Sequence, residues 1–357
     1  MHLTLMAIDW ALIIEKLVLV AFIVTVSLVV AMYETYAERK VAAFIQDRRG
    51  PNRAGPFGIL QPVADGLKLF MKEEIIPNLS NRFLFVLGPG LAMLTAMMTS
   101  AVVPWSSHLV IAGRTIDLQI ADVNIGILYI FGVVSMGVYG VMIGGWASNN
   151  KFSLLAAIRG ASQIISYELA MGLSLIALLM LTGSLSLKTI VAQQLDHRYF
   201  VLYQPLGFLI FLICAFAECN RTPFDLSEAE SELNFGYHQE YSSMKLGFYL
   251  FAEYVNMFIS SAVMATLFWG GYDIPFVNDA AFGLQHGQNL LAILQGLSLF
   301  IKIAFFIFVF IWVRWTIPRF RYDQLMNLGW KGLIPLSLLN MIITGFILLL
   351  KNNHWHF

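Results

Sequence analysis

The sequence predicts an all-α polytopic membrane protein with eight transmembrane helices, and two observations support that prediction. Of the 357 residues, 58% are hydrophobic and only 12% are charged, whereas soluble domains carry about 25% charged residues. Apolar stretches of roughly 20 residues, long enough for a helix to cross a hydrocarbon core of about 30 Å, recur along the whole chain. We therefore expect a single integral-membrane domain over 1–357.

The predicted spans follow one another along the chain and lie near 10–33, 83–104, 122–146, 159–182, 200–217, 246–270, 290–313 and 333–350. The first is too long, and too directly followed by further spans, to be a cleaved signal peptide. A segment in lipid must satisfy its own backbone hydrogen bonds, and the strands of a membrane barrel would show short alternating runs. These segments are therefore predicted to be helices.

The composition excludes several kinds of site within the chain. A net charge of zero gives no support to nucleic-acid binding. The only cysteines are Cys214 and Cys219, too few for an iron–sulfur cluster that needs four thiolates. No nucleotide-binding glycine motif and no zinc-protease motif occurs. We expect no metal site, so any electron chemistry belongs to a partner.

The charges predict how the chain sits in the membrane. The loops after the odd-numbered spans hold sixteen Lys and Arg residues, whereas the loops after the even-numbered spans hold only Arg114, Lys188 and Arg198. Because positive charge marks the cytoplasmic side, the odd loops face the cytoplasm (or the matrix of an organelle). We expect a bacterial inner-membrane protein with both termini in the periplasm.

The long cytoplasmic loop after the first span, 34–82, is much longer than most connections. It contains Glu38 and Arg39, then an arginine-, glycine- and proline-rich turn that includes Arg48, and then an amphipathic stretch over 59–71 that carries Asp65. An amphipathic stretch of this kind is predicted to lie at the membrane interface. The simpler interpretation is a basic loop that touches anionic lipid headgroups.

The second long cytoplasmic loop, after the fifth span, is rich in acidic residues, although it lies on the side of the membrane where basic residues are expected. Ser227 and Glu230 have the spacing of a capping box, and acids in a first turn suit the helix dipole. Capping accounts for Glu228 and Glu230 but leaves four further acids without a role: Glu218, Asp225, Glu232 and Glu240. Crowded carboxylates share protons near neutral pH, so a proton relay is the alternative interpretation.

Three ionisable residues lie inside predicted spans and away from the span ends: Glu168, Glu253 and Lys302. A carboxylate at mid-membrane costs roughly 2.5–3.5 kcal/mol, so Glu168 and Glu253 are functional candidates. Lys302 is equally well explained as a structural partner. The Gly-Pro-Gly run at 88–90 interrupts the second span early, and we expect a kink packed by neighbouring helices more than a broken helix that lines a cavity.

Several runs of the sequence identify it with a known family. They are Glu-Arg-Lys at 38–40, Arg-Gly-Pro-Asn at 49–52, Gln-Pro-Val-Ala-Asp-Gly at 61–66, Glu-Cys-Asn-Arg-Thr-Pro-Phe-Asp at 218–225 and Pro-Arg-Phe-Arg-Tyr at 318–322. In this order they resemble the family that includes NADH dehydrogenase subunit 1 of mitochondrial complex I and its counterpart, the H subunit of the bacterial NADH:quinone oxidoreductase. The resemblance covers nearly the whole chain, except for a segment near 271–289.

The resemblance implies a membrane-arm subunit that helps form a quinone-binding chamber and couples quinone reduction to proton translocation. The residues it assigns to the quinone chamber are Glu38, Arg39, Arg48, Asp65, Phe224 and Arg319. Those it assigns to the proton relay are Glu168, Glu218, Asp225, Glu228, Glu230 and Glu253. These roles rest on the matching motifs and not on composition or spacing.

The resemblance also implies ubiquinone or menaquinone as substrate, with FMN and iron–sulfur clusters held by partner subunits. Those partners would be the peripheral-arm subunits of the quinone site and the small membrane-arm subunits of complex I, besides membrane lipid. Two alternatives remain: the anchor subunit of a related membrane-bound hydrogenase or formate hydrogenlyase, and a secondary transporter. Transporters commonly show internal repeats with paired broken helices, and the sequence shows none.

Overall fold

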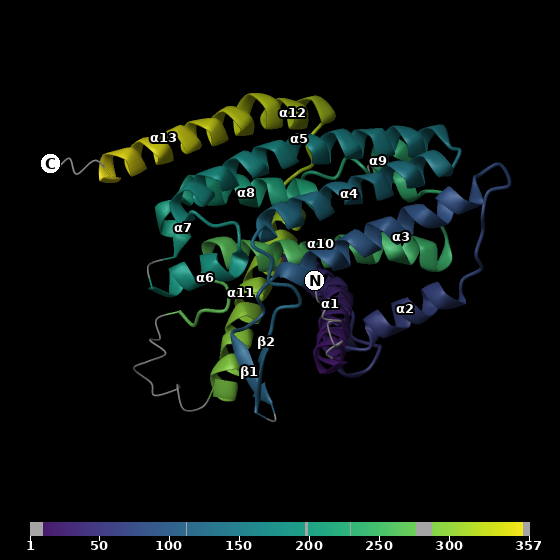
Figure 1. Ribbon diagram of the computed structural model, residues 1–357. Coiled ribbons are helices and arrows are strands. Elements are labelled where there is room, and N and C mark those ends of the chain that lie inside the picture. Colours follow the sequence, from purple (N-terminus) through teal and green to yellow (C-terminus); the bar gives the residue numbers. More distant parts are fainter. Residues whose placement is uncertain (1–9, 112, 197–198, 229, 276–287, 353–357) are drawn as a thin grey trace, which may run out of the picture.

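The structure is a computed structural model that describes residues 10–111, 113–196, 199–228, 230–275 and 288–352. Most of these residues lie in helices, and the one sheet among them is a two-stranded hairpin. In Figure 1, the helices α3, α4, α5 and α13 lie side by side in that order, while α1 and α11 cross at a steep angle to them. The all-α polytopic fold predicted from the sequence is confirmed.

Seven helical runs among the described residues are long and apolar enough to cross a membrane. They are α1 (Trp10–Ile45), α3 (Arg82–Thr99) with a short 3-10 extension (Ser100–Val102), α4 (Gly126–Ala147), α5 (Lys151–Thr182), α10 (Ser243–Phe268), α11 (Gln288–Thr316), and α12 (Tyr322–Asn327) continued through a π-helical turn (Leu328–Leu333) into α13 (Ile334–Asn352). Each of these runs corresponds to a predicted span.

The remaining predicted span, 200–217, is not one long helix. It is divided into α7 (Phe200–Tyr203) and α8 (Pro205–Glu218), which has 14 residues. Pro205 has no backbone N–H to continue the helix begun by α7. The buried side chain of Gln204 occupies the junction, where its Nε2 donates to Thr344 Oγ1 at 2.7 Å and its Oε1 accepts from Asn340 Nδ2 at 2.9 Å. The break is thereby fixed against α13.

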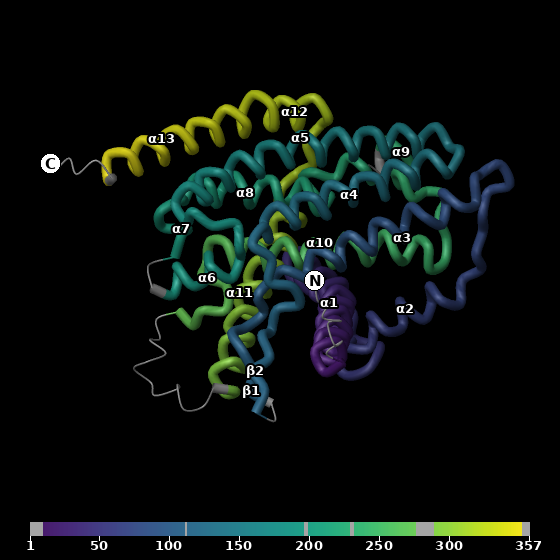
Figure 2. Tube along the Cα trace, viewed as in Figure 1, coloured from purple at the N-terminus to yellow at the C-terminus, as the bar shows by residue number. Residues whose placement is uncertain are grey.

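The shorter elements lie between these helices. They are the 3-10 turn η1 (Pro56–Gly58), α2 (Gln61–Met71), β1 (His108–Ile111) paired antiparallel with β2 (Arg114–Asp117), α6 (Leu187–Asp196), α9 (Glu230–Leu233) and the 3-10 turn η3 (Gly236–His238). The predicted amphipathic stretch forms α2. Figure 2 shows α2 beside α1, beneath the level of α10.

Helix α1 is longer than its predicted span, because it continues without a break to Ile45. Glu34, Glu38 and Arg39, which the sequence placed in a loop, therefore lie on the last turns of a straight helix. Residues four apart on a helix share a face, so Glu34 and Glu38 point the same way, and both are buried.

Glycine brings the backbones of α3, α4 and α10 into contact. A Cβ at Gly140 would lie 2.8 Å from the backbone N of Ala92 on α3, and one at Gly88 would lie 3.0 Å from Cα of Gly144. The hydroxyl of Tyr249 on α10 donates to the carbonyl of Gly140 at 3.0 Å. Small residues commonly allow such close approach in membranes. Helix α3 runs through its Gly-Pro-Gly sequence unbroken, with Gly88 and Pro89 buried.

The ammonium group of Lys302 is surrounded by backbone carbonyl oxygens. Its Nζ donates to the backbone carbonyl oxygens of Trp269 at 2.7 Å, Gly271 at 2.9 Å and Asp273 at 2.7 Å. These carbonyls follow the carboxyl end of α10, where the last carbonyl groups of a helix lack intrahelical partners and attract cations. Lys302 thus joins α11 to the end of α10, which favours the structural interpretation.

We expect Gly140→Leu to destabilise the folded chain, since the new side chain would meet the backbone of α3, which no rotamer change can move aside. Overpacking of this kind costs about 1–3 kcal/mol. The matched control is Gly132→Leu on the same helix, where an added Cβ meets nothing within 4 Å. Thermal denaturation of the purified chain should give a lower Tm for Gly140→Leu than for Gly132→Leu; equal values would contradict the packing between α3 and α4.

Candidate functional site

A buried carboxylate, Glu38, lies at the centre of a group of charges. Only 7% of the residue is exposed. Its Oε1 lies 2.6 Å from Nη1 of Arg314 on α11, and its Oε2 lies 3.6 Å from Nη1 of Arg221 in the loop after α8. The hydroxyl of Tyr254 on α10 donates to the same Oε2 at 2.9 Å. Two cations and a hydrogen bond together stabilise the charge in this buried place.

Arg221 extends this group in two directions. Its guanidinium lies 4.1 Å from the ring centroid of Tyr254, a cation–π distance. It also lies close enough to Glu34, Glu228 and Glu253 to interact with them electrostatically. One arginine therefore joins the acids of α1 to those of the loop and of α10.

Asp225, in the same loop, faces Arg319, with 3.4 Å between Oδ2 and Nη2. Burial raises the pKa of Asp225 to about 7, an effect that Glu228 strengthens and that Arg319, Arg314 and Arg221 oppose. A carboxyl group with that pKa changes its charge at physiological pH, which is the property that proton transfer requires.

The loop that carries Arg221 and Asp225 is held firmly in place. The Nε2 of the buried Gln163 on α5 donates to the carbonyl oxygens of Ala217 at 2.9 Å and Phe224 at 2.6 Å. Gly160, one turn earlier, allows Ser227 to pack against α5, because a Cβ there would lie 2.8 Å from Cβ of Ser227. Within the described residues Ser227 Oγ has no hydrogen-bond partner, so its role is packing.

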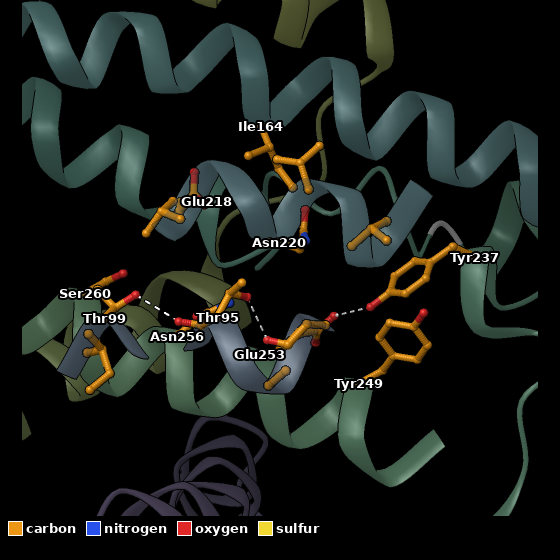
Figure 3. A pocket seen from close by; sticks show the side chains of 17 residues that line it. Thr95, Thr99, Ile164, Glu218, Asn220, Tyr237, Tyr249, Glu253, Asn256 and Ser260 are labelled. Carbon is orange, nitrogen blue, oxygen red and sulfur yellow. Dashed lines mark hydrogen bonds between the residues drawn. The ribbon is translucent and has the colours of Figure 1, made fainter. Parts of the chain in front are cut away.

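A second group of acids surrounds an enclosed cavity of about 50 Å³ between α3, α4, α5, α8 and α10 (Figure 3). Glu218, the last residue of α8, and the buried Glu253 of α10 lie on its wall. The other polar residues around it are Thr95, Thr99, Asn220, Tyr237, Tyr249, Asn256 and Ser260. A cavity of this size, with several polar side chains on its wall, has room for a few water molecules.

Glu168 belongs to the same region. It lies on α5, accepts a hydrogen bond from Ser135 Oγ on α4, and is close enough to Glu218 to interact with it electrostatically. Glu228 is close enough to Glu253 to interact with it electrostatically. Glu168, Glu218, Glu253 and Glu228 therefore form a series from the middle of α5 to the loop.

A larger cavity, of about 340 Å³, lies between α1, α2 and α10. Arg39 and Asp65 lie on its wall and form an ion pair of 2.7 Å between Nη1 and Oδ2. Most of the remaining wall is apolar and comes from Met32, Pro62, Leu69, Leu246, Leu250 and Phe251. Tyr254 also lies on this wall, so the cavity reaches the residue that binds Glu38.

Other residues that the sequence singled out lie elsewhere. Arg48 is exposed, and its Nε donates to Gln46 Oε1 at 2.6 Å. Phe224 is buried between Tyr167 and Phe320, with centroid distances of 5.3 and 5.5 Å. Neither Arg48 nor Phe224 borders the enclosed cavity or the larger one.

Three acids of the second loop remain. Glu230 begins α9, but its side chain lies outside the described residues. Glu232 pairs with Arg159 at 2.9 Å, both partly exposed. Glu240 accepts from Asn150 Nδ2 at 2.7 Å. The expected crowding of all the loop acids therefore does not extend to Glu232 and Glu240.

Five residues of the site were not predicted as site residues: Glu34, Arg221, Tyr237, Tyr254 and Arg314. Arg221 and Arg314 lie in or beside the motifs of the family resemblance, and Glu34 precedes Glu38 by one helical turn. That spacing could have indicated a shared helix face. Tyr237 carries no local signal, because its position depends on how the loop folds back.

Comparison with known proteins gives a consistent picture. The family model described as NADH dehydrogenase matches residues 17–345. The chain is 66% identical over 336 residues to an NADH-quinone oxidoreductase H subunit of Cytophaga hutchinsonii, and the match covers 94% of this chain and 97% of the relative.

Two further relatives, also NADH-quinone oxidoreductase H subunits, agree over nearly their whole length. The one from Flavobacterium johnsoniae is 63% identical, covering 95% of this chain and 96% of the relative. The one from Geobacter metallireducens is 47% identical, covering 98% and 100% respectively. The match is too extensive to reflect membrane composition alone. The chain belongs to the NADH dehydrogenase family.

Proposed function

We propose that this chain is a membrane-arm subunit of a proton-translocating NADH:quinone oxidoreductase, in which it forms part of the quinone-binding chamber and couples quinone reduction to proton translocation. The names of its relatives support the reaction. The observation that supports this chain's part in it is the cavity between α1, α2 and α10, whose wall includes Tyr254, the residue that also binds Glu38.

The chemistry of this cavity suits a quinone. Ligand cavities of about 300–1,000 Å³ with a mostly apolar wall and a few polar groups are typical of small-molecule sites. A quinone has a long apolar tail and a head with two carbonyl acceptors. In this proposal the tail lies along Leu250 and Phe251, and the head meets the donors Arg39 and Tyr254. Ubiquinone and menaquinone share these features.

Coupling would pass through Tyr254 and Glu38. A change in charge or hydrogen bonding at Tyr254 alters the environment of Glu38 and Arg221, which contact it directly. Arg221 also acts on Glu228 and Glu253. Because the proton occupancy of interacting carboxyl groups is shared, such a change would redistribute protons along the series that continues through Glu218 to Glu168.

The partners in this proposal supply the electrons. Within the described residues no group of three His, Cys, Asp or Glu side chains could hold a metal ion. In this proposal, FMN and the iron–sulfur clusters reside in neighbouring subunits of complex I. In this proposal, the exposed arginine-rich turn that contains Arg48 contacts the peripheral-arm subunits. The apolar outer faces of α5 and α13 contact lipid or the small membrane-arm subunits.

The Lys and Arg distribution supports an orientation with the 34–82 and 218–246 loops in the cytoplasm of a bacterium and both termini in the periplasm.

We expect Gly66→Phe to raise the KM for quinone about tenfold or more, because the phenyl ring would narrow the cavity, and small changes in pocket size are worth factors of this order. Gly66 lies on the cavity wall, and an added Cβ there meets nothing within 4 Å, so α2 should fold normally. The measurement is NADH:quinone turnover of the assembled complex at varied quinone concentration. Gly132→Phe, on an exposed part of α4, is the control, and equal KM values in the two variants would contradict the cavity assignment.

Asp225 should titrate near pH 7. The infrared band of a protonated carboxyl that disappears in Asp225→Asn should be present at about pH 6 and largely lost by about pH 8. Arg319→Gln should move its midpoint upward, because the ion pair at 3.4 Å favours the charged form. A band already absent at about pH 5, or an unchanged midpoint in Arg319→Gln, would contradict this environment of Asp225.

The orientation can be tested with single cysteines in spheroplasts. A maleimide that does not cross membranes should label Arg114→Cys at once, but should label Asn52→Cys only after permeabilisation. The native Cys214 and Cys219 are both buried, so background labelling should be low. The reverse pattern would show that the long loops face the periplasm.

A further inference from the structure

A third cavity, with a volume of about 360 Å³, lies away from the acid series, between α1, α11 and the β1–β2 hairpin. In Figure 1 the hairpin lies between α11 and α1, in the lower half of the view. The volume is in the range of small-molecule sites. Most of the wall is apolar and includes Leu19, Ile23 and Val26 of α1 and Ile293, Leu297 and Phe300 of α11. A ligand of this cavity is therefore apolar.

Hydrogen bonds fix the walls of this cavity to one another. At the start of α11, Asn289 Oδ1 accepts from the backbone N of Val110 at 2.7 Å, and its Nδ2 donates to the carbonyl of Val110 at 2.9 Å. On the other side of the cavity, Lys16 Nζ on α1 donates to the carbonyl of Gln119 at 3.0 Å. The hollow between these joined elements is therefore preformed.

The cavity opens sideways, towards the surroundings of the two helices. Phe22, Ile293 and Leu297 on its wall are each more than half exposed, whereas Leu19 and Ile23 behind them are buried. Both α1 and α11 are long and apolar enough to span a membrane. An apolar opening on the side of spanning helices faces the acyl chains of lipids.

Lys16 lies at the mouth of the cavity, at the level of the lipid headgroups. It precedes Leu19 by one helical turn and so shares a face with it, and its partner Gln119 directly follows Leu118 of the cavity wall. The uncharged stretch after it, 17–33, has a length of roughly 25 Å as a helix, close to the hydrocarbon thickness of about 30 Å. Its ammonium group is therefore at one edge of the hydrocarbon.

The positive charge of Lys16 is available to a ligand. Within the described residues no carboxylate pairs with it, because Asp117 and Asp122 near the hairpin pair with Lys188 at 2.9 and 3.9 Å. Glu15 is adjacent in sequence, but successive residues of a helix point about 100° apart. An ammonium group has three N–H donors, and the Gln119 carbonyl uses one of them. An anionic group can accept from the others.

We propose that this cavity binds an acyl chain of an anionic phospholipid, whose phosphate group binds Lys16. The lipid belongs to the leaflet on the side where α1 begins. Its chain runs from Lys16 along Leu19 and Ile23 towards Val26 and Phe300, deeper in the membrane. The ligand fills the space that the side chains of α1 and α11 leave between them, and its site is separate from the proposed quinone cavity.

The experiment uses the assembled complex in phosphatidylcholine vesicles that contain phosphatidylglycerol with a photoactivatable diazirine on its acyl chain. Mass spectrometry then identifies the labelled peptides of this chain. Peptides that contain Ile23 and Leu297 should be labelled, and the labelling should saturate at a low fraction of the probe and be displaced by unlabelled phosphatidylglycerol.

Lys16→Gln tests the headgroup contact, since glutamine keeps a donor for the Gln119 carbonyl but removes the charge. The same peptides should be labelled more strongly by the phosphatidylglycerol probe than by the corresponding phosphatidylcholine probe. In Lys16→Gln this preference should fall about fivefold, the factor that one basic residue contributes at a membrane surface.

Gly296→Phe tests the cavity itself. Gly296 lies on the wall, and an added Cβ there would lie 3.9 Å from the carbonyl oxygen of Trp105, an ordinary contact distance, so α11 should fold normally. The phenyl ring would occupy the cavity and should reduce the labelling of both peptides severalfold. The control Gly132→Phe, on an exposed part of α4, should keep the labelling of the unaltered chain.

Labelling that rises in proportion to the probe without saturation, or that is equal for the two headgroups, would show ordinary lipid contact and overturn the inference. Cross-links from the cavity wall to a neighbouring subunit in place of lipid would overturn it too, as would labelling displaced by quinone and not by phosphatidylglycerol. These measurements use the unaltered chain, so they are decisive even if Gly296→Phe assembles poorly.

Discussion

Burial of the Glu38 carboxylate constrains much of the arrangement of helices around it. Breaking a buried ion pair leaves an uncompensated charge, at a cost of about 3–5 kcal/mol, and the partners of Glu38 come from α10, α11 and the loop after α8. These segments cannot separate from α1 independently. The adjacent Arg39 points to a different face of the same turn, where it pairs with Asp65 of α2. One turn of α1 therefore contributes to both the buried charges and the wall of the larger cavity.

Helix α10 also contributes side chains to two cavities, and does so over a greater length than α1. Leu246, Leu250 and Tyr254, at intervals of four, lie on the wall of the cavity beside α1 and α2, whereas Tyr249, Glu253, Asn256 and Ser260 lie on the wall of the enclosed cavity. Intervals of three and four define separate stripes on a helix. Helix α10 therefore separates the two cavities and presents one row of side chains to each. Its adjacent residues Glu253 and Tyr254 lie on the walls of different cavities, and both interact electrostatically with Arg221.

Hydropathy and charge predicted the spans, the amphipathic α2 and the acidic character of the second loop, because these depend on local composition. Arg39 and Asp65, which pair in the structure, had been assigned to one chamber by the family resemblance. Local patterns could not predict that Arg221 and Arg314, far apart in sequence, meet at Glu38. Nor could they show that Gln204 and Pro205 divide one apolar stretch, or that Glu232 and Glu240 turn away towards Arg159 and Asn150. Those outcomes depend on tertiary contacts.

The balance of charge around Arg221 gives the site its capacity to hold protons. The described residues of the two connected groups include three guanidinium groups, on Arg221, Arg314 and Arg319, and a larger number of buried or half-buried carboxyl groups, on Glu34, Glu38, Glu168, Glu218, Asp225, Glu228 and Glu253. Isolated charges are strongly disfavoured in such surroundings. The carboxyl groups outnumber the guanidinium groups, and burial favours the protonated form of a carboxyl group that has no cation beside it. In the proposed coupling, a change at Tyr254 or Arg319 that weakens one arginine's contact would alter the number or the position of such protons, so that binding in the larger cavity would affect the acids at the enclosed one.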